Sequence, residues 1–393
     1  MSSAGSKAAP TATKLTPQQA NAAFRQAVVN NAVKIVQQLQ SISVVPGAQL
    51  AYNFTPRNVG LLLGFYVMVS VNMLNTGATS SLTQYGPANL ISNFTFSDFN
   101  NYQRINAPGW YLSLVNSVKA RRPYAAAVTL NNHPINYSNN FTVISAPATL
   151  TTTPGTLVQQ LYYIPVAYSE YDLRGAIYAA VTGGQMNLQI TPNATPWVAS
   201  GDATLAVYSG GTGGAYYGNM TIDVYQVFYD QLPTINQGGQ AKVVVPQIDL
   251  GTTYELHQTV ANNLAQGQEN TIAFSNYREF LSTAAIYDNA GVLNVGSDIS
   301  YWALQAANLL YIFKKEPFLV AADARREIGT DMPKGTYYFS SREKPINTQT
   351  FGNMNLVINP SSVTNSTSQV LVGYETFAQQ NVVLGAQAFA NAG

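Results

Sequence analysis

Alternate positions between residues 61 and 73 are bulky and apolar, and no other feature of this chain restricts its fold as strongly. These positions are Leu61, Leu63, Phe65, Val67, Val69, Val71 and Met73. The other parity includes the polar residues Tyr66, Ser70 and Asn72. Alternation with a period of two predicts a long β-strand with one buried face. The apolar run at 59–74 is too short for a membrane span, and it alternates.

The chain supports such strands with very few ionised side chains. Nineteen Lys and Arg and eighteen Asp and Glu make up 9% of its 393 residues, against about 25% in an ordinary globular domain. We expect a β protein this poor in charge to hold much of its surface against copies of itself. Because one β-sandwich usually holds roughly 100–250 residues, two domains are expected.

The few charges are distributed unevenly along the chain. Residues 1–169 carry nine basic groups and one acid, Asp98, whereas the remainder carries ten basic and seventeen acidic groups. The first 97 residues contain no acid. A basic end suggests an anionic partner, either nucleic acid or the headgroups of a membrane. The alternative is that these scattered charges serve only solubility.

Residues 1–14 are expected to form a flexible arm, after which the period becomes helical. An apolar stripe predicts an amphipathic helix from Pro17 to about residue 39. The stripe consists of Phe24, Val28, Ala32, Ile35 and Leu39. Thr16 is the expected N-cap, with Pro17 at the first helical position. The alternative to a partner-binding helix is one that packs on its own domain. No secretory signal is expected, since residues 1–19 lack an apolar core.

Downstream of Val44 the patterns predict β-strands separated by turn-rich stretches. The strands expected in the first half lie at 60–73, 141–144, 158–166, 186–190, 203–208 and 221–229. Those expected in the second half lie at 270–273, 280–287, 335–340, 354–358 and 370–377. Residues 300–310 and 318–328 are expected to be helical. The similar segments 224–228 and 373–377 each close a domain, which predicts two copies of one sandwich with a boundary near residues 241–250.

No catalytic constellation stands out in the sequence. The absence of cysteine and the presence of only two histidines exclude a disulfide framework, a thiol nucleophile and a His-rich metal site. The glycine-rich stretch at 210–214 lacks the Lys-Ser/Thr of a phosphate-binding loop, so it is expected to be a surface loop.

Two smaller groups of charged residues leave alternatives open. Glu170 and Asp172 have a spacing that suits a glycosidase pair on a strand, but they also suit the start of a helix capped by Ser169. The densest basic patch could contact phosphate, although no nucleic-acid module surrounds it. This patch consists of Lys119, Arg121 and Arg122.

An ordered series of short strings carries a family resemblance. In the first half the strings are Phe54-Thr55-Pro56-Arg57-Asn58-Val59-Gly60, Tyr85-Gly86-Pro87-Ala88-Asn89-Leu90, Gly109-Trp110, Ala146-Pro147-Ala148-Thr149 and Pro165-Val166-Ala167-Tyr168-Ser169-Glu170. In the second half they are Asp230-Gln231-Leu232-Pro233, Tyr277-Arg278-Glu279-Phe280-Leu281-Ser282-Thr283, Asp331-Met332-Pro333-Lys334-Gly335 and Gly373-Tyr374-Glu375. The series resembles the major capsid protein of the tectiviruses, which are tail-less icosahedral phages with an internal membrane. The match covers most of the chain, from about residue 50 to residue 377.

The resemblance implies an all-β fold of two eight-stranded jelly-roll β-sandwiches in tandem, a double jelly-roll, with an N-terminal amphipathic helix. Together with the boundary expected above, it predicts four parts. These are the N-terminal arm and helix (1–45), the first jelly-roll (46–244), the second jelly-roll (245–377) and a C-terminal arm (378–393).

The resemblance also implies a structural role in a virion capsid, without enzymatic activity or a cofactor. Three chains are expected to form a homotrimer with a pseudo-hexagonal footprint, and the trimers to tile an icosahedral shell over an internal lipid membrane. Other capsid, vertex or cement proteins are expected partners, no direct nucleic-acid role is expected, and synthesis is expected in the host cytoplasm. The alternative is a glycan-binding or receptor-binding β-sandwich.

The N-terminal basic residues are the expected membrane-facing site in this scheme. They are Lys7, Lys14, Arg25 and Lys34. Each could contribute up to about 1 kcal/mol near anionic lipid before screening. One chain would therefore bind weakly, and many copies in a shell would together bind firmly through effective concentration.

Overall fold

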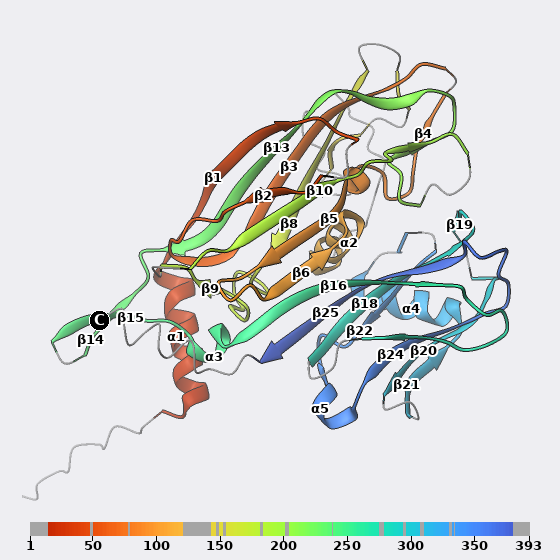
Figure 1. The fold of residues 1–393 in the computed structure, drawn as a ribbon. Coiled ribbons are helices and arrows are strands. Elements are labelled where there is room, and N and C mark those ends of the chain that lie inside the picture. Colours follow the sequence, from red (N-terminus) through yellow and green to blue (C-terminus); the bar gives the residue numbers. More distant parts are fainter. Residues whose placement is uncertain are drawn as a thin grey trace, which may run out of the picture.

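The computed structural model describes residues 15–379, except positions 48–49, 78, 121–142, 147–148, 152–154, 181–183, 201–203, 238, 275–278, 294–295, 307–309, 330–331 and 334. Two β-sandwiches follow one another along the chain and lie next to each other (Figure 1). Among the described residues, no helix has the length and apolar character needed to cross a bilayer.

The first sandwich packs two sheets face to face. One sheet contains, in spatial order, β1 (Val33–Val44), β13 (Gly214–Asp230), β3 (Leu61–Asn75), β8 (Thr156–Pro165) and β7 (Val143–Ser145), with β9 (Ile177–Tyr178) paired to β3. The facing strands are β2 (Tyr52–Phe54), β10 (Asn187–Pro192), β5 (Ile91–Ser97) and β6 (Gln103–Ala107). The ring centroids of Phe65 on β3 and Phe96 on β5 lie 5.4 Å apart, which marks the contact between the two sheets.

The second sandwich repeats this arrangement. One sheet contains β16 (Thr252–Asn262), β25 (Gln369–Gln379) and β18 (Glu279–Asn289), with β19 (Val292–Leu293), β22 (Thr336–Ser340) and β23 (Ile346–Asn347) also paired to β18. The facing sheet contains, in order, β17 (Asn270–Ala273), β24 (Met354–Pro360), β20 (Ile299–Ala306) and β21 (Leu310–Lys315). The fully buried Trp302 on β20 contacts Tyr337 on β22, with 5.1 Å between ring centroids.

The remaining described elements are short or connect the sandwiches. They are α1 (Pro17–Asn31), β4 (Ser81–Leu82), η1 (Gly86–Leu90), α2 (Gly109–Lys119), β11 (Trp197–Val198), β12 (Tyr208–Ser209), β14 (Thr234–Gln237), β15 (Gln240–Val243), α3 (Gln247–Leu250), α4 (Pro317–Ile328) and α5 (Thr348–Phe351).

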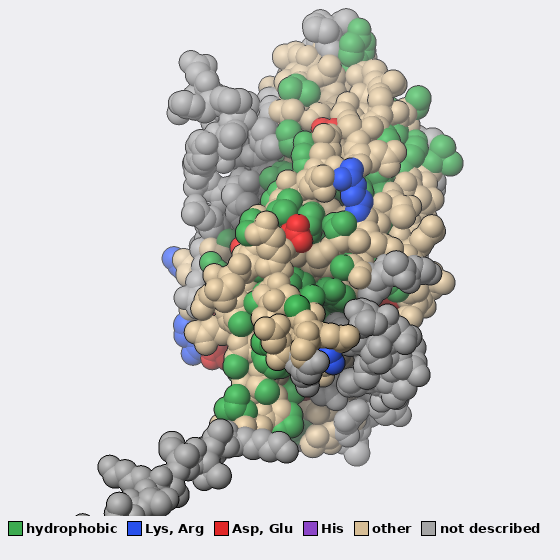
Figure 2. Space-filling view, turned by 90° about the vertical axis from the view of Figure 1, so that its left-hand side faces the viewer, with side chains coloured by type: hydrophobic (Ala, Val, Ile, Leu, Met, Phe, Trp, Pro, Cys, Tyr) green, Lys and Arg blue, Asp and Glu red, His purple; other side chains and the backbone are tan. Residues whose placement is uncertain are grey.

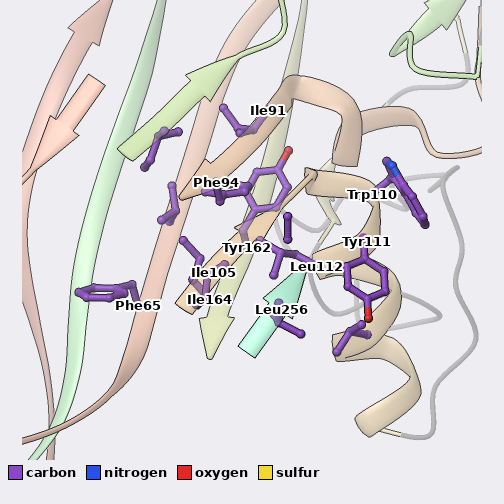
Figure 3. Close-up of a cluster of buried hydrophobic side chains, with 14 of the residues drawn as sticks. Phe65, Ile91, Phe94, Ile105, Trp110, Tyr111, Leu112, Tyr162, Ile164 and Leu256 are labelled. Atoms are coloured by element: carbon purple, nitrogen blue, oxygen red, sulfur yellow. The ribbon is translucent and has the colours of Figure 1, made fainter. Parts of the chain in front are cut away.

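The two sandwiches share one sheet. Strand β6 of the first pairs in parallel with β16 of the second at Ile105 and Leu256. This contact joins the strands of both sandwiches into a single ten-stranded sheet. Helix α2 lies against this junction, and Figure 3 shows Leu112 of α2 in one apolar cluster with Leu256 of β16.

Helix α2 is buried on all sides, which identifies it as a core helix. Its Tyr111 ring covers Gly373 on β25, where an added Cβ atom would lie 2.3 Å from the ring. A side chain at position 373 would therefore push α2 away from the second sandwich. The sequence pattern does not reveal α2, because an apolar segment of this length fits a strand equally well.

The burial predicted for β3 is confirmed. All seven alternating apolar residues between 61 and 73 are at most 2% exposed. However, Leu61 and Leu63 belong to a different cluster from Phe65. The register of β3 against β13 shifts between Gly64 and Leu62, which leaves Leu63 as a bulge residue. Leu61 and Leu63, at the start of this alternation, therefore face the α1 side of the sheet and not the space between the two sheets.

The N-terminal helix is shorter than predicted. Thr16 is its N-cap, and its hydroxyl oxygen accepts from the backbone N–H of Gln19 at 3.3 Å. The helix ends at Asn31, so the prediction that it extends to about residue 39 is wrong. Residues from Val33 onward form β1 instead, because this segment, rich in β-branched residues, pairs with β13 from Val33 to Val44, with one register shift at Leu39. The first sandwich therefore begins before residue 46.

Most predicted strands are confirmed, but one predicted helix and one predicted strand are not. The helix predicted at 300–310 is wrong where the structure describes it, because β20 continues to Ala306 and β21 begins at Leu310. From Trp302 onward β20 is buried on both faces, so the polar alternation that marks a strand is missing. Of 203–208, only Tyr208 lies in a strand within the described part, and residues 141–142 lie outside it. The helix predicted at 318–328 is confirmed as α4.

We predict that Gly373→Ala destabilises the protein by about 2 kcal/mol, because the new methyl group overlaps the buried Tyr111 ring. Urea unfolding followed by circular dichroism measures this loss. Gly373→Ala in a Tyr111→Leu background should cost less than half as much, since the smaller side chain leaves room. An equal cost in both backgrounds would contradict the contact.

Candidate assembly surfaces

A buried charge cluster lies between the two sandwiches. Its centre is Glu375 on β25, whose carboxylate is fully buried. Arg342 donates to it from Nε at 2.8 Å and from Nη2 at 2.5 Å. The hydroxyls of Tyr254 and Ser282 also donate to it. Lys119 reaches across from α2 of the first sandwich, with its Nζ 3.5 Å from Oε1.

This environment shifts the pKa values of Glu375 and Lys119. Burial raises the pKa of Glu375, but the charges of Arg342 and Lys119 outweigh it and hold the pKa at about 2. Burial lowers the pKa of Lys119 to about 8. The Lys119 ammonium also lies over the rings of Tyr168 and Tyr254, 4.4 and 4.2 Å from their centroids. The cluster therefore holds a compensated carboxylate at neutral pH and ties α2 to β25.

A second buried carboxylate also links the sandwiches. Glu255 on β16 is fully buried and accepts from the hydroxyl of Tyr102, which precedes β6, at 2.6 Å. Thr253 donates to it at 3.0 Å, and His257 Nε2 lies 2.9 Å from its other oxygen. Polar contacts thus cross the same boundary at two places, which favours one fixed arrangement of the sandwiches.

Arg25, predicted to face a membrane, lies against the connection between the sandwiches. Its guanidinium contacts buried Asp249 on α3 with Nε–Oδ2 and Nη2–Oδ1 distances of 2.5 and 2.6 Å. Asn21 donates to the same carboxylate at 2.9 Å and accepts from the backbone of Ile248. The hydrogen bond to Asp249 raises the pKa of Arg25. Helix α1 is therefore fastened to α3 by paired charges.

Lys34, the other predicted membrane residue in the described part, forms an ion pair with Glu170. Lys7 and Lys14 lie outside the described residues. The two predicted basic residues that the structure describes, Arg25 and Lys34, each have an acidic partner within the chain.

Glu170 and Asp172, for which a glycosidase pair and a helix cap were the alternatives, each form an ion pair with a basic side chain. Asp172 contacts Arg174 with an Nη2–Oδ2 distance of 2.6 Å, while Glu170 is paired with Lys34. Burial raises the pKa of Asp172, but Arg174 overcomes this and leaves the pKa below its ordinary value. Ser169 accepts from the backbone of Asp172 at 2.9 Å and caps a turn, and no helix follows.

The structure describes one of the three residues of the predicted basic patch, Lys119, and its side chain is mostly buried. Lys119 belongs to the interdomain cluster, and Arg121 and Arg122 lie outside the described residues. The glycine-rich stretch at 210–214 lies between β12 and β13, and Gly210, Gly211 and Gly213 have positive φ angles. This backbone is typical of a turn that only glycine adopts easily.

A cleft of about 1140 Å³ opens beside the interdomain cluster. Lys119, Tyr168 and Arg342 line it, together with residues of α4. Lys315 and Arg326 also line it, and both pair with Asp323, so part of the charge around the cleft is compensated. Sequence reasoning missed Arg342 and Glu375. A lone acid inside the apolar strand at 370–377 was the available signal.

Exposed apolar side chains form the surfaces that suit protein contacts. Val33 and Val36 lie on the edge strand β1, at 46% and 50% exposure. Others lie on the hairpin of β14 and β15 and on the β21–α4 side of the second sandwich; they are Ile235, Val243, Tyr311, Ile312, Phe318 and Leu319. Figure 2 shows scattered hydrophobic groups on one face with few charged ones. Scattered apolar side chains are normal on a protein surface, so the low charge of this face is the feature that suits association with other protein chains.

Comparison with known proteins agrees with this arrangement. The N-terminal half matches the family model for the P3 major capsid protein N-terminal region over residues 2–232. Residues 251–391 match the model for the P3 major capsid protein C-terminal region. The chain is 35% identical over 373 residues to major capsid protein P3 of Enterobacteria phage PRD1, covering 93% of each protein.

Solved structures with low sequence identity have the same fold. The MCP of Sulfolobus turreted icosahedral virus superposes with a TM-score of 0.62 at 10% identity, over 88% of this chain and 97% of that one. The capsid protein in the PBCV-1 virus capsid model superposes with a TM-score of 0.53 at 11% identity, over 88% and 94%. These likenesses establish the fold.

We predict that Glu375→Gln destabilises the chain by about 3–5 kcal/mol, because Arg342 and Lys119 remain buried without their counter-charge. Thermal and urea unfolding measure this loss. Glu269→Gln is the matched control, since the side chain of Glu269 is 38% exposed, and it should cost less than about 1 kcal/mol. Equal effects of both substitutions would contradict the role of the cluster.

The same carboxylate predicts a pH dependence. The folded-state pKa of Glu375 is about 2, whereas a glutamate in the unfolded chain has a pKa of about 4.3. Its stabilising contribution is therefore complete above about pH 5 and is lost as the pH falls through the folded-state pKa. We expect the free energy of unfolding of the wild type to fall faster than that of Glu375→Gln across this window. Parallel curves would argue against it.

Proposed function

This chain belongs to the P3 major capsid protein family, and from that membership we propose that three copies form a trimer that tiles an icosahedral shell over a lipid membrane. The family establishes the coarser role: the chain is a structural capsid protein and not an enzyme, and it works in the virion by self-assembly into a capsid lattice. Its double jelly-roll fold, predicted from the family resemblance, is confirmed.

The observation that carries the trimer proposal is the fixed pairing of two similar sandwiches within one chain. They share a ten-stranded sheet, and the Glu375 cluster ties them together at α2. Three such chains around an axis present six sandwiches, which suits a pseudo-hexagonal footprint. A hexagonal footprint fills a flat facet without gaps, whereas a chain with one sandwich would need six copies to form that footprint.

The surface supports this proposal. Ionised side chains make up only 9% of the sequence, and exposed apolar groups occur on both sandwiches. Contacts between such surfaces bury apolar area without the cost of removing charges from water. Many weak contacts of this kind allow errors to be corrected while a shell grows.

The membrane-facing role of the N-terminal region is also a proposal. Helix α1 extends from the first sandwich at one end of the molecule, and the chain before it contains Lys7 and Lys14 and no acid (Figure 1). Arg25 and Lys34 have acidic partners, so we assign them a smaller share of the attraction than Lys7 and Lys14. Contacts with vertex or cement proteins, and synthesis in the host cytoplasm, are proposed on the family resemblance alone.

We predict that light scattering during size-exclusion chromatography gives a mass near three times 42.3 kDa. The expected trimer follows from the proposed closure of three two-sandwich chains. A monomer that binds carbohydrate saturably would instead support the alternative of a glycan-binding sandwich.

We predict that Lys7→Gln with Lys14→Gln weakens co-flotation of the trimer with vesicles containing anionic lipid, because about 1 kcal/mol per basic residue is lost before screening. Arg25→Gln with Lys34→Gln is the matched control with the same change in net charge, and it should weaken binding less. Unchanged flotation of the Lys7 and Lys14 variant would contradict the proposal.

A further inference from the structure

The segment that connects the two sandwiches contains a hairpin that belongs to neither sandwich. After β13 ends at Asp230, β14 and β15 form an antiparallel hairpin before α3 begins. Figure 1 shows this hairpin extending away from both sandwiches, beyond α1. At its base the backbone N–H of Val244 donates to the carbonyl of Pro233 at 2.7 Å. The two ends of the hairpin are therefore adjacent.

The hairpin is exposed on both faces. Every described residue of β14 and β15 whose side-chain burial is known is exposed, including Ile235 at 46% and Val243 at 42%. Ile235 pairs with Lys242, and Thr234 pairs with Val243. Because directly paired residues point to the same face of a hairpin, Ile235 and Val243 lie on opposite faces.

A hairpin of this kind is incomplete alone. An isolated pair of strands is marginally stable in water unless a third strand or a packed face supports it. Both outer edges of β14 and β15 have no other strand partner in the described sheets, so their backbone groups remain available for pairing. The hairpin thus has apolar groups on two faces and pairing groups on two edges, which fits insertion between elements of another molecule.

We propose that the β14–β15 hairpin is an intersubunit arm that packs on a second copy of this chain. The proposal rests on the proposed self-assembly into trimers and names a segment that holds them. Lys242 is the one charged residue among 234–243, so the arm lacks the charge that would hold it to a lipid surface or to nucleic acid. A surface of apolar and uncharged polar groups matches the weakly charged surface of another copy.

The position of the arm also defines the type of contact. The hairpin projects from one side of the molecule only (Figure 1). An arm that reaches from one side to a different surface on the next copy makes a heterologous contact, and such contacts generate closed rings when the rotation allows it. Each chain of a trimer would then give one arm and receive one.

The absence of cysteine allows a direct test. Ile235→Cys, labelled with an environment-sensitive fluorophore, should show a blue-shifted emission as the protein concentration rises through the range in which trimers form. Leu205→Cys is the matched control, since Leu205 is exposed to a similar extent, at 45%, on the first sandwich. Its emission should stay constant. A label at position 235 that remains in water within a verified trimer would overturn the proposal.

A second variant removes the arm. Replacement of residues 234–243 by Gly-Gly joins two chain ends that the backbone hydrogen bond between Val244 and Pro233 already holds together. We expect the same circular dichroism spectrum as the wild type, and an apparent dissociation concentration of the trimer raised at least about tenfold, since apolar burial at Ile235 and Val243 is lost. A variant as trimeric as the wild type would overturn the arm while leaving the proposed function intact. A monomeric wild type would instead overturn the proposed function.

A lipid surface is the competing occupant. If removal of the arm abolished vesicle flotation and left the trimer unchanged, the hairpin would be a membrane contact and the proposal would be wrong. Flotation that falls only together with loss of the trimer supports the arm, because attachment depends on the number of linked copies.

Discussion

The fold depends on one buried interaction between the sandwiches, where Lys119 of α2 reaches the carboxylate of Glu375 on β25 beside Arg342. A carboxylate without exposure would be strongly destabilising if its partners were absent. Its compensation requires α2, β25 and the segment after β22 to meet at one point. The cluster therefore selects a single relative position of the two sandwiches, which the apolar packing of Tyr111 on Gly373 reinforces.

Because the two sandwiches are held in one arrangement within the chain, apolar groups can remain exposed on its surface. The cores are complete within the chain, so exposed apolar groups on β1, on the hairpin and near α4 can be reserved for neighbouring copies. The paired charges near the N-terminus also contribute to the stability of the single subunit. Arg25 meets Asp249 and Lys34 meets Glu170, so these residues stabilise the subunit first. Assembly then adds contacts to a chain that is already folded.

Local pattern was sufficient where one strand face or one helix end decides the structure. The alternation in β3, the Thr16 cap and helix α4 were all predictable for this reason. The predicted helix failed beyond Asn31, because the pairing of β1 with β13 depends on residues far along the chain. Glu375 could not be assigned from sequence, since its partners come from distant segments. The hairpin was missed because its short, mostly polar strands resemble a loop.

Electron-microscopic class averages of the purified protein test this account most directly. The account predicts particles of three chains with six lobes at nearly equal spacing, and the two lobes of each chain at one fixed separation and angle. Single two-lobed particles, or lobes that vary in their relative angle from particle to particle, would contradict it.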